Sequence, residues 1–91
     1  MDQIDKIKLS MINQLNLTFM MQYHTPNDRR VIIETIGNRT NMDPETLRSI
    51  LVDGQVVPGR SLETLTIEYL VNIATELKFA IRISVYGETY G

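Results

Sequence analysis

Arginine is the residue type in this sequence whose chemistry and placement say most about function. Arginines crowd the middle of the chain, at Arg29, Arg30, Arg39, Arg48 and Arg60, and only Arg82 lies elsewhere. A guanidinium group donates several hydrogen bonds in a planar fork, which matches phosphate oxygens and the edge of guanine. Each of these side chains taken alone is more often simply solvated. Their shared region nevertheless indicates a face that could meet nucleic acid.

The net charge of the whole chain argues against binding to nucleic acid. The 91 residues include 9 Lys+Arg and 11 Asp+Glu, a formal net charge of −2, and the pI is about 5.2. Domains that bind a duplex are often basic, because lysine and arginine neutralise phosphates. The overall field gives no help toward DNA, so any such binding must come from local clustering of the arginines.

The residues needed for other site chemistries are scarce. The chain has no cysteine and a single histidine, His24, which removes disulfides, thiol catalysis, cysteine-based zinc sites and a histidine metal cluster. His24 precedes Thr25 and Pro26 and shows no triad arrangement, and no glycine belongs to a phosphate-cradling loop. We therefore expect no enzyme, no catalytic residue, no bound metal and no cofactor.

Length and hydropathy predict one cytoplasmic domain over residues 1–91. With 43% hydrophobic residues, the chain can build one modest core. No apolar run approaches the roughly 18 residues that span a bilayer, and the N-terminus lacks a signal-peptide pattern. We expect no membrane partner.

Residues 36–50 predict the element that positions these arginines. Its apolar residues fall where two short helices pack across a tight turn, namely Ile36, Met42, Leu47 and Ile50. Gly37 lies where the helices approach most closely, and Asn41 lies at the turn, where left-handed backbone angles are needed. Asp43 is expected to cap the second helix and Pro44 to open it. The pattern predicts a helix-turn-helix over about residues 28–53, the alternative being any two-helix corner.

Apolar spacing predicts the remaining helices. A three-to-four repeat indicates a first helix over about residues 2–22, and the motif helices cover about 28–40, capped by Asn27, and 44–53, stopped by Gly54. A short turn near 62–65 and a helix capped by Thr66 and ending near Lys78 follow. Val56 and Val57 either tuck under the domain or form a contact surface.

Residues 79–86 alternate large apolar with mostly smaller or polar side chains, which predicts a β-strand. A lone strand leaves backbone donors and acceptors unpaired on both edges. Pairing with the same strand of a second copy across a two-fold axis would satisfy them and give a homodimer. The dimerisation residues would be Phe79, Ile81, Ile83 and Val85. The alternative is an irregular tail lying on the core.

The motif at 36–50, the helix at 67–77 and the strand after it together resemble the lambda-repressor-like helix-turn-helix proteins of the Xre type. The resemblance covers about residues 28–86. It implies a mainly α fold of four to five helices with one C-terminal β-strand, as found in phage regulators and antitoxins. The chain departs from that pattern at Thr40, which replaces an apolar residue, in its long loop at 54–65, and at Lys78, where a glycine often ends the helix.

The resemblance also implies which positions would contact double-stranded DNA: Asn38, Arg39, Glu45, Thr46, Arg48, Ser49 and Arg60. Arg48 is the best candidate base reader, because arginine can donate two hydrogen bonds to guanine. Thr46 or Ser49 could contact phosphate or a base edge. Glu45 could accept from cytosine, although helix capping is the more ordinary role for Asp43 and Glu45.

Three function classes remain open at this level. The first is a small dimeric transcription regulator, phage-borne or an antitoxin, that binds a palindromic operator. The second is a helix-turn-helix fold redirected to protein binding, with a toxin or a host factor as partner, which the negative net charge favours. The third is an adaptor that only assembles.

Overall fold

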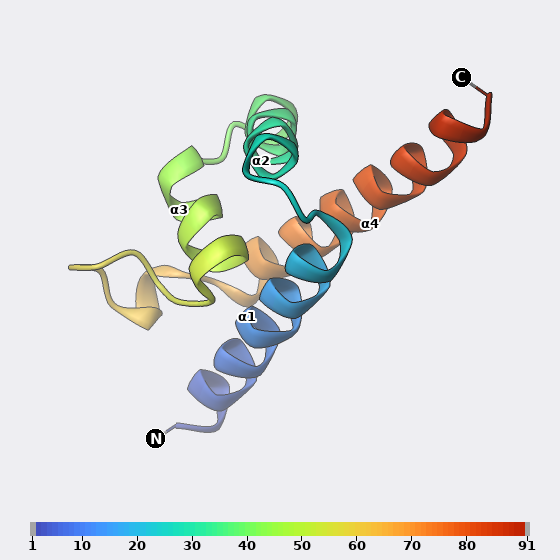
Figure 1. The fold of residues 1–91 in the computed structure, drawn as a ribbon. Helices are drawn as coiled ribbons and strands as arrows, with labels where there is room; N and C mark the ends of the chain where they lie inside the picture. The colour runs from blue at the N-terminus through green and yellow to red at the C-terminus, as the bar shows by residue number, and fades with distance from the viewer. Residues whose placement is uncertain (1, 91) are drawn as a thin grey trace.

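The computed structural model describes the backbone of residues 2–90 and the side chains of residues 2–83. Four α-helices form this part of the chain: α1 (Gln3–Gln22), α2 (Pro26–Thr40), α3 (Pro44–Arg48) and α4 (Ile67–Tyr90). A π-helical turn, η1 (Ser49–Asp53), continues α3, and a 3₁₀ turn, η2 (Leu62–Thr64), precedes α4. The prediction of a mainly α architecture is confirmed, and Figure 1 shows α4 extending well beyond the other helices.

Side-chain caps begin the first two helices. The carboxylate of Asp2 accepts from the backbone N–H of Ile4 at 3.2 Å, and the hydroxyl of Thr25 accepts from the N–H of Asp28 at 3.1 Å. Thr25, rather than Asn27, is therefore the N-cap of α2, and the helix begins with Pro26 in its first turn. The predicted start at residue 28 is two residues late, because proline is well suited to the first helical position.

The turn between α2 and α3 has the predicted backbone. Asn41 ends α2 with φ 60° and ψ 23°, in the left-handed region. A Cβ built on Gly37 would lie 3.3 Å from the carbonyl oxygen of Met42 and 3.7 Å from Cδ1 of Leu47. The close approach expected at Gly37 is therefore confirmed. In Figure 1, α2 is seen end-on while α3 is seen from the side, so the two helices cross steeply.

Contacts with α1 and a glycine fix the end of the α3–η1 segment. The amide of Asn16 donates to the carbonyl oxygens of Leu51 at 2.8 Å and Val52 at 3.0 Å. Gly54 then adopts φ 68°, and its N–H donates to the carbonyl of Ser49. The helix stops at Gly54, as predicted, and its last turn is widened from α to π geometry.

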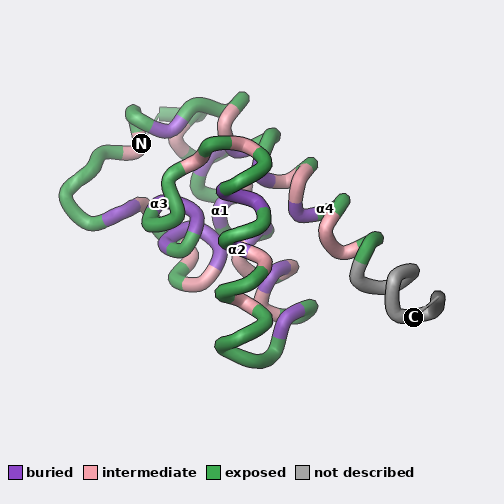
Figure 2. Tube along the Cα trace, turned by 90° about the horizontal axis from the view of Figure 1, so that it is seen from above, coloured by how far each residue is buried: buried purple, intermediate pink, exposed green. Residues whose placement is uncertain are grey.

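One hydrophobic core joins all four helices. Its largest fully buried side chains are Ile12, Phe19, Ile36, Leu47, Ile50, Leu51, Leu70, Ile73 and Leu77. Figure 2 shows the buried positions concentrated where the elements meet, while the outer faces are exposed. Val57 is buried and Val56 packs against the core. The loop at 54–65 therefore tucks its valines under the domain.

The C-terminal strand predicted at 79–86 is wrong. Thr66 caps α4 as expected, with its hydroxyl accepting from the N–H of Tyr69 at 3.0 Å, but the helix continues past Lys78 to Tyr90. No strand occurs within residues 2–90. The physical reason is that the buried stripe of α4 continues at helical spacing into this segment, where Ile81 packs against the core. Neither glycine nor proline interrupts residues 67–86.

The loss of the strand removes the basis for strand-mediated dimerisation. Phe79, Ile81 and Ile83 lie on α4, and a helix makes its backbone hydrogen bonds internally. The backbone of this segment therefore has no row of unpaired N–H and C=O groups that pairing with a second copy would satisfy. The side chain of Val85 lies outside the described residues. Phe79 and Ile83 are nonetheless exposed, at 45% and 54%.

Candidate nucleic-acid interface

A groove runs between the start of α2 and the outer face of the α3–η1 segment. Its volume is about 470 Å³. Arginines and apolar residues line this arginine groove: Pro26, Arg29, Arg30, Ile33, Pro44, Arg48 and Val52. Three of the clustered arginines therefore share one surface, although they lie up to 19 positions apart in the sequence. The local clustering expected from the sequence is present here.

The two arginines that α2 contributes are partly engaged. Nε of Arg29 donates to the carbonyl oxygen of Tyr23 at 2.7 Å, which ties this arginine to the end of α1. Arg30 pairs with Glu34 one turn later at 3.1 Å and donates to the amide oxygen of Asn27 at 2.8 Å. Both side chains of the Arg30–Glu34 pair are more than half exposed, so this pair contributes little to stability and can rearrange.

Arg48 differs from both, because it keeps its hydrogen-bonding capacity. It is exposed on the outer face of α3, and no hydrogen bond or ion pair joins it to another residue among those whose side chains are described. An unpaired guanidinium in an open groove is available for phosphate or for the edge of a base.

Thr46 and Ser49 do not face outward as the sequence suggested. They are only 5% and 6% exposed. The hydroxyl of Thr46 donates to the carboxylate of Asp43 at 3.0 Å, and the carbonyl of Ser49 accepts from the N–H of Gln55 at 3.0 Å. Both lie on the buried face of the α3–η1 segment, which also carries Leu47 and Ile50.

Arg39 points to α4 and away from the arginine groove. Its Nε lies 2.9 Å from a carboxylate oxygen of Glu76, and its guanidinium carbon lies 4.8 Å from the centre of the Phe79 ring. These contacts link α2 to α4 at what we call the α2–α4 junction (Arg39, Glu76 and Phe79). A DNA contact by its remaining N–H groups would have to be made from this junction, outside the arginine groove.

The other expected contacts are exposed but scattered. Asn38 and Glu45 are exposed on α2 and α3 without lining the arginine groove. Arg60 is exposed on the loop before α4 and borders a different hollow, next to the α2–α3 turn. Of the seven positions expected to contact DNA, the groove contains Arg48 alone.

The groove also contains residues outside that set of seven. The sequence predicts Arg29 and Arg30 only as members of the arginine cluster and gives Pro26 no role in a site. The family pattern places contacts around the second helix, whereas the crossing of the helices brings the first turn of α2 beside Arg48. The signal that could have found them is the arginine clustering itself.

Within the described residues we also looked for a metal site and for a membrane-spanning helix, and found neither. Among them, no group of three or more histidine, aspartate or glutamate side chains is placed to hold a metal ion. None of their helices combines the length and hydropathy needed to cross a bilayer.

Comparison with models of protein families, with curated proteins and with solved structures finds no match to this chain.

Proposed function

We propose that this chain is a DNA-binding regulator that uses α2, the turn at 41–43 and the α3–η1 segment as a helix-turn-helix of the lambda-repressor-like kind. The three arginines of the arginine groove contact DNA, with Arg48 reading a base edge and the α2 arginines holding phosphates. Asn41 and Gly37 support this proposal, because a left-handed turn residue and a small residue are what such a motif requires.

The observation that carries the proposal is the state of Arg48. Its guanidinium is exposed and unpaired within the described side chains, and it shares an open groove with two further arginines. Phosphate contacts fix the register of such a motif on the duplex, while contacts to base edges give specificity. The net charge of −2 then predicts binding that is weak on arbitrary sequences and confined to this face.

A palindromic operator would require two copies of the chain. In that case the half-sites lie about 34 Å apart, one helical turn of DNA. The exposed apolar side chains of α4, Phe79 and Ile83, are the surface we would test first for self-association.

The second candidate is protein binding through the same groove. Its lining mixes arginines with Pro26, Ile33 and Val52, a combination that suits an acidic segment with apolar side chains, such as one on a toxin or host factor. The net charge of −2 opposes the dense negative charge of a DNA duplex more than it opposes a short segment with a few carboxylates.

A salt-dependent mobility-shift assay on random genomic DNA fragments, run beside a pull-down from lysate, separates the two candidates. We expect DNA binding that falls steeply with salt, and that is weakened in Arg48→Ala but unchanged in the matched control Arg82→Ala, which lies far along α4. Absence of binding to any duplex at low salt would contradict the DNA proposal. Recovery of one discrete protein that Arg48→Ala no longer captures would establish the second candidate instead.

A further inference from the structure

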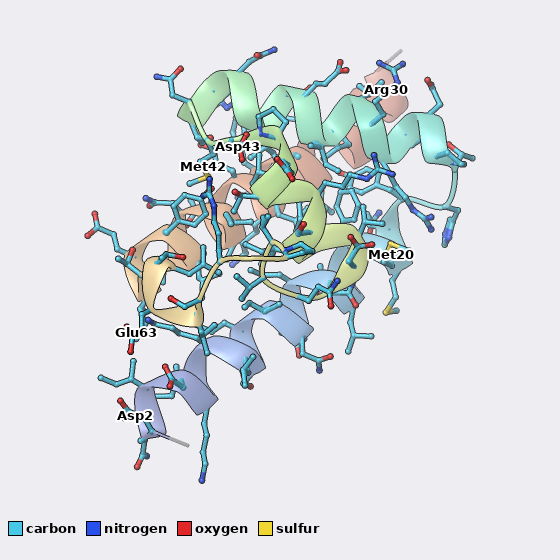
Figure 3. All side chains as sticks on the ribbon, turned by 90° about the vertical axis from the view of Figure 1, so that its left-hand side faces the viewer. Asp2, Met20, Arg30, Met42, Asp43 and Glu63 are labelled. Carbon is cyan, nitrogen blue, oxygen red and sulfur yellow. The ribbon has the colours of Figure 1, made fainter. Side chains whose placement is uncertain are left out.

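A second hollow lies on the other flank of α3, away from the arginine groove. It has a volume of about 390 Å³ and is lined by the α2–α3 turn, the loop before α4 and the first turns of α4. That volume is in the range of small-molecule sites. Figure 3 shows Met42 and Asp43 at the turn, at the opposite end of α2 from Arg30. We call this cavity the polar hollow.

The rim of the polar hollow has two opposite charges that do not pair with each other. Asp43 and Arg60 both line it, and the ion pairs among the described side chains are those of Arg30 with Glu34 and of Arg39 with Glu76. One carboxylate oxygen of Asp43 accepts from the hydroxyl of Thr46, so its other oxygen remains available.

Three further polar side chains line the hollow without a hydrogen-bond partner among the described residues. Asn41, Tyr69 and Asn72 line the hollow, and none of their side chains makes a hydrogen bond to another described residue. The buried apolar residues Val57 and Leu65 also line the hollow and form what we call its floor. An apolar floor, neutral donors and acceptors, and a separated pair of opposite charges are what a small zwitterion requires.

The pKa of the Tyr69 phenol is raised in this setting. Burial raises its pKa, the nearby Asp43 carboxylate raises it further, and Arg60 lowers it. The phenol therefore remains a hydrogen-bond donor at neutral pH. Tyr69, Asp43 and Arg60 all line the polar hollow.

We propose that the polar hollow binds a free α-amino acid, with Arg60 pairing with its carboxylate and Asp43 with its ammonium group. The side chain of the ligand lies toward the floor, against Val57 and Leu65. The site is independent of the proposed function, because Arg60 lines the polar hollow and not the arginine groove.

The binding test uses thermal stability of the full chain and needs no DNA, so it can fail separately from the proposed function. Each common free L-α-amino acid is added at millimolar concentration, with acetate and methylamine as single-charge comparators. A ligand of the native state raises the melting temperature. We expect one amino acid or a chemically related few to do so, and both comparators to have no effect.

Two variants locate the site, and isothermal titration measures the affinity of the stabilising amino acid. Arg60→Gln and Asp43→Asn should each weaken binding about tenfold, the loss of one charge-assisted contact. The Asp43 side chain makes no cap hydrogen bond to the backbone of α3, contrary to the expectation from the sequence. It accepts from the hydroxyl of Thr46, which the amide oxygen of asparagine can also do, so Asp43→Asn retains the start of α3. Arg82→Gln, the control, should bind as the parent does.

Three results would overturn the proposal. They are the absence of any shift with all the amino acids, an equal shift with acetate or methylamine alone, and unchanged affinity in Arg60→Gln.

Discussion

The arginine groove and the α2–α4 junction use the same residue type in opposite ways. At the junction, Arg39 is held by Glu76 at 2.9 Å and stacks over Phe79 at 4.8 Å, so its hydrogen-bonding capacity serves the packing of two helices. In the groove, Arg48 is exposed and unpaired among the described side chains. Residue type alone therefore does not mark a binding arginine. What separates the two is whether a neighbouring helix covers the face from which the side chain projects.

The same contrast explains why clustering in sequence was only a partial guide. Arg39 and Arg48 lie nine positions apart, yet the helix crossing sends one to α4 and the other to solvent. An arginine committed to the fold should matter for stability, and an uncommitted one should matter for binding. The following changes test that separation, from the largest expected effect to the smallest.

Leu47→Asp should unfold the domain, so that both the arginine groove and the α2–α4 junction are lost. Leu47 is 0% exposed, and an unpaired charge buried there costs several kcal/mol. Thermal melting followed by circular dichroism measures the effect, with Glu45→Ala on the exposed face of the same helix as control. A Leu47→Asp protein that melts like the parent would show that α2 and α3 do not pack as described.

Gly37→Leu should lower the free energy of unfolding by about 1–3 kcal/mol through overpacking. A Cβ at this position already meets the Met42 carbonyl oxygen at 3.3 Å, so the larger side chain must push α2 and α3 apart. Denaturant titration gives the value. Gly37→Ala is the comparison variant, because the higher helix propensity of alanine offsets part of the cost of crowding. If Gly37→Leu and Gly37→Ala had equal free energies of unfolding, the close approach of α2 and α3 at Gly37 would be contradicted.

Arg48→Ala should weaken binding of a specific duplex by about 1–3 kcal/mol and relax the preference at one base pair of each half-site. Its melting temperature should match the parent, because no fold contact is lost. Arg30→Ala should instead weaken all sequences alike and flatten the salt dependence. Fluorescence anisotropy at several salt concentrations measures both. Loss of preference in Arg30→Ala with none in Arg48→Ala would reverse the roles.

Arg39→Ala should do the opposite of Arg48→Ala, with a small loss of stability and unchanged affinity for DNA. The side chains of Arg39 and Glu76 are 52% and 21% exposed, so solvent screens the pair, and the loss should not exceed about 1 kcal/mol even with the stacking on Phe79. Denaturant titration beside the binding assay shows both. A loss of affinity without loss of stability would place Arg39 among the DNA contacts after all.

The sequence by itself determined the features that depend on local backbone preference. The apolar repeat of residues 3–22, the left-handed Asn41, the crowded Gly37, the stop at Gly54 and the cap at Thr66 were all predictable, because each is decided within one or two helical turns. The burial of Leu47 and Ile50 followed from the same spacing.

Only the tertiary structure decided the secondary structure of residues 79–86 and the contacts that the arginines make. Alternation in a short apolar segment fits a strand or one face of a helix, and continuation of the α4 stripe onto the core selected the helix. The partner of Arg39, the burial of Thr46 and Ser49, and the meeting of Arg29 and Arg30 with Arg48 all depend on how α2 crosses α3 and α4. The angles at which helices cross are set by packing between residues that are distant in the sequence, and the spacing of residues along one helix does not determine them.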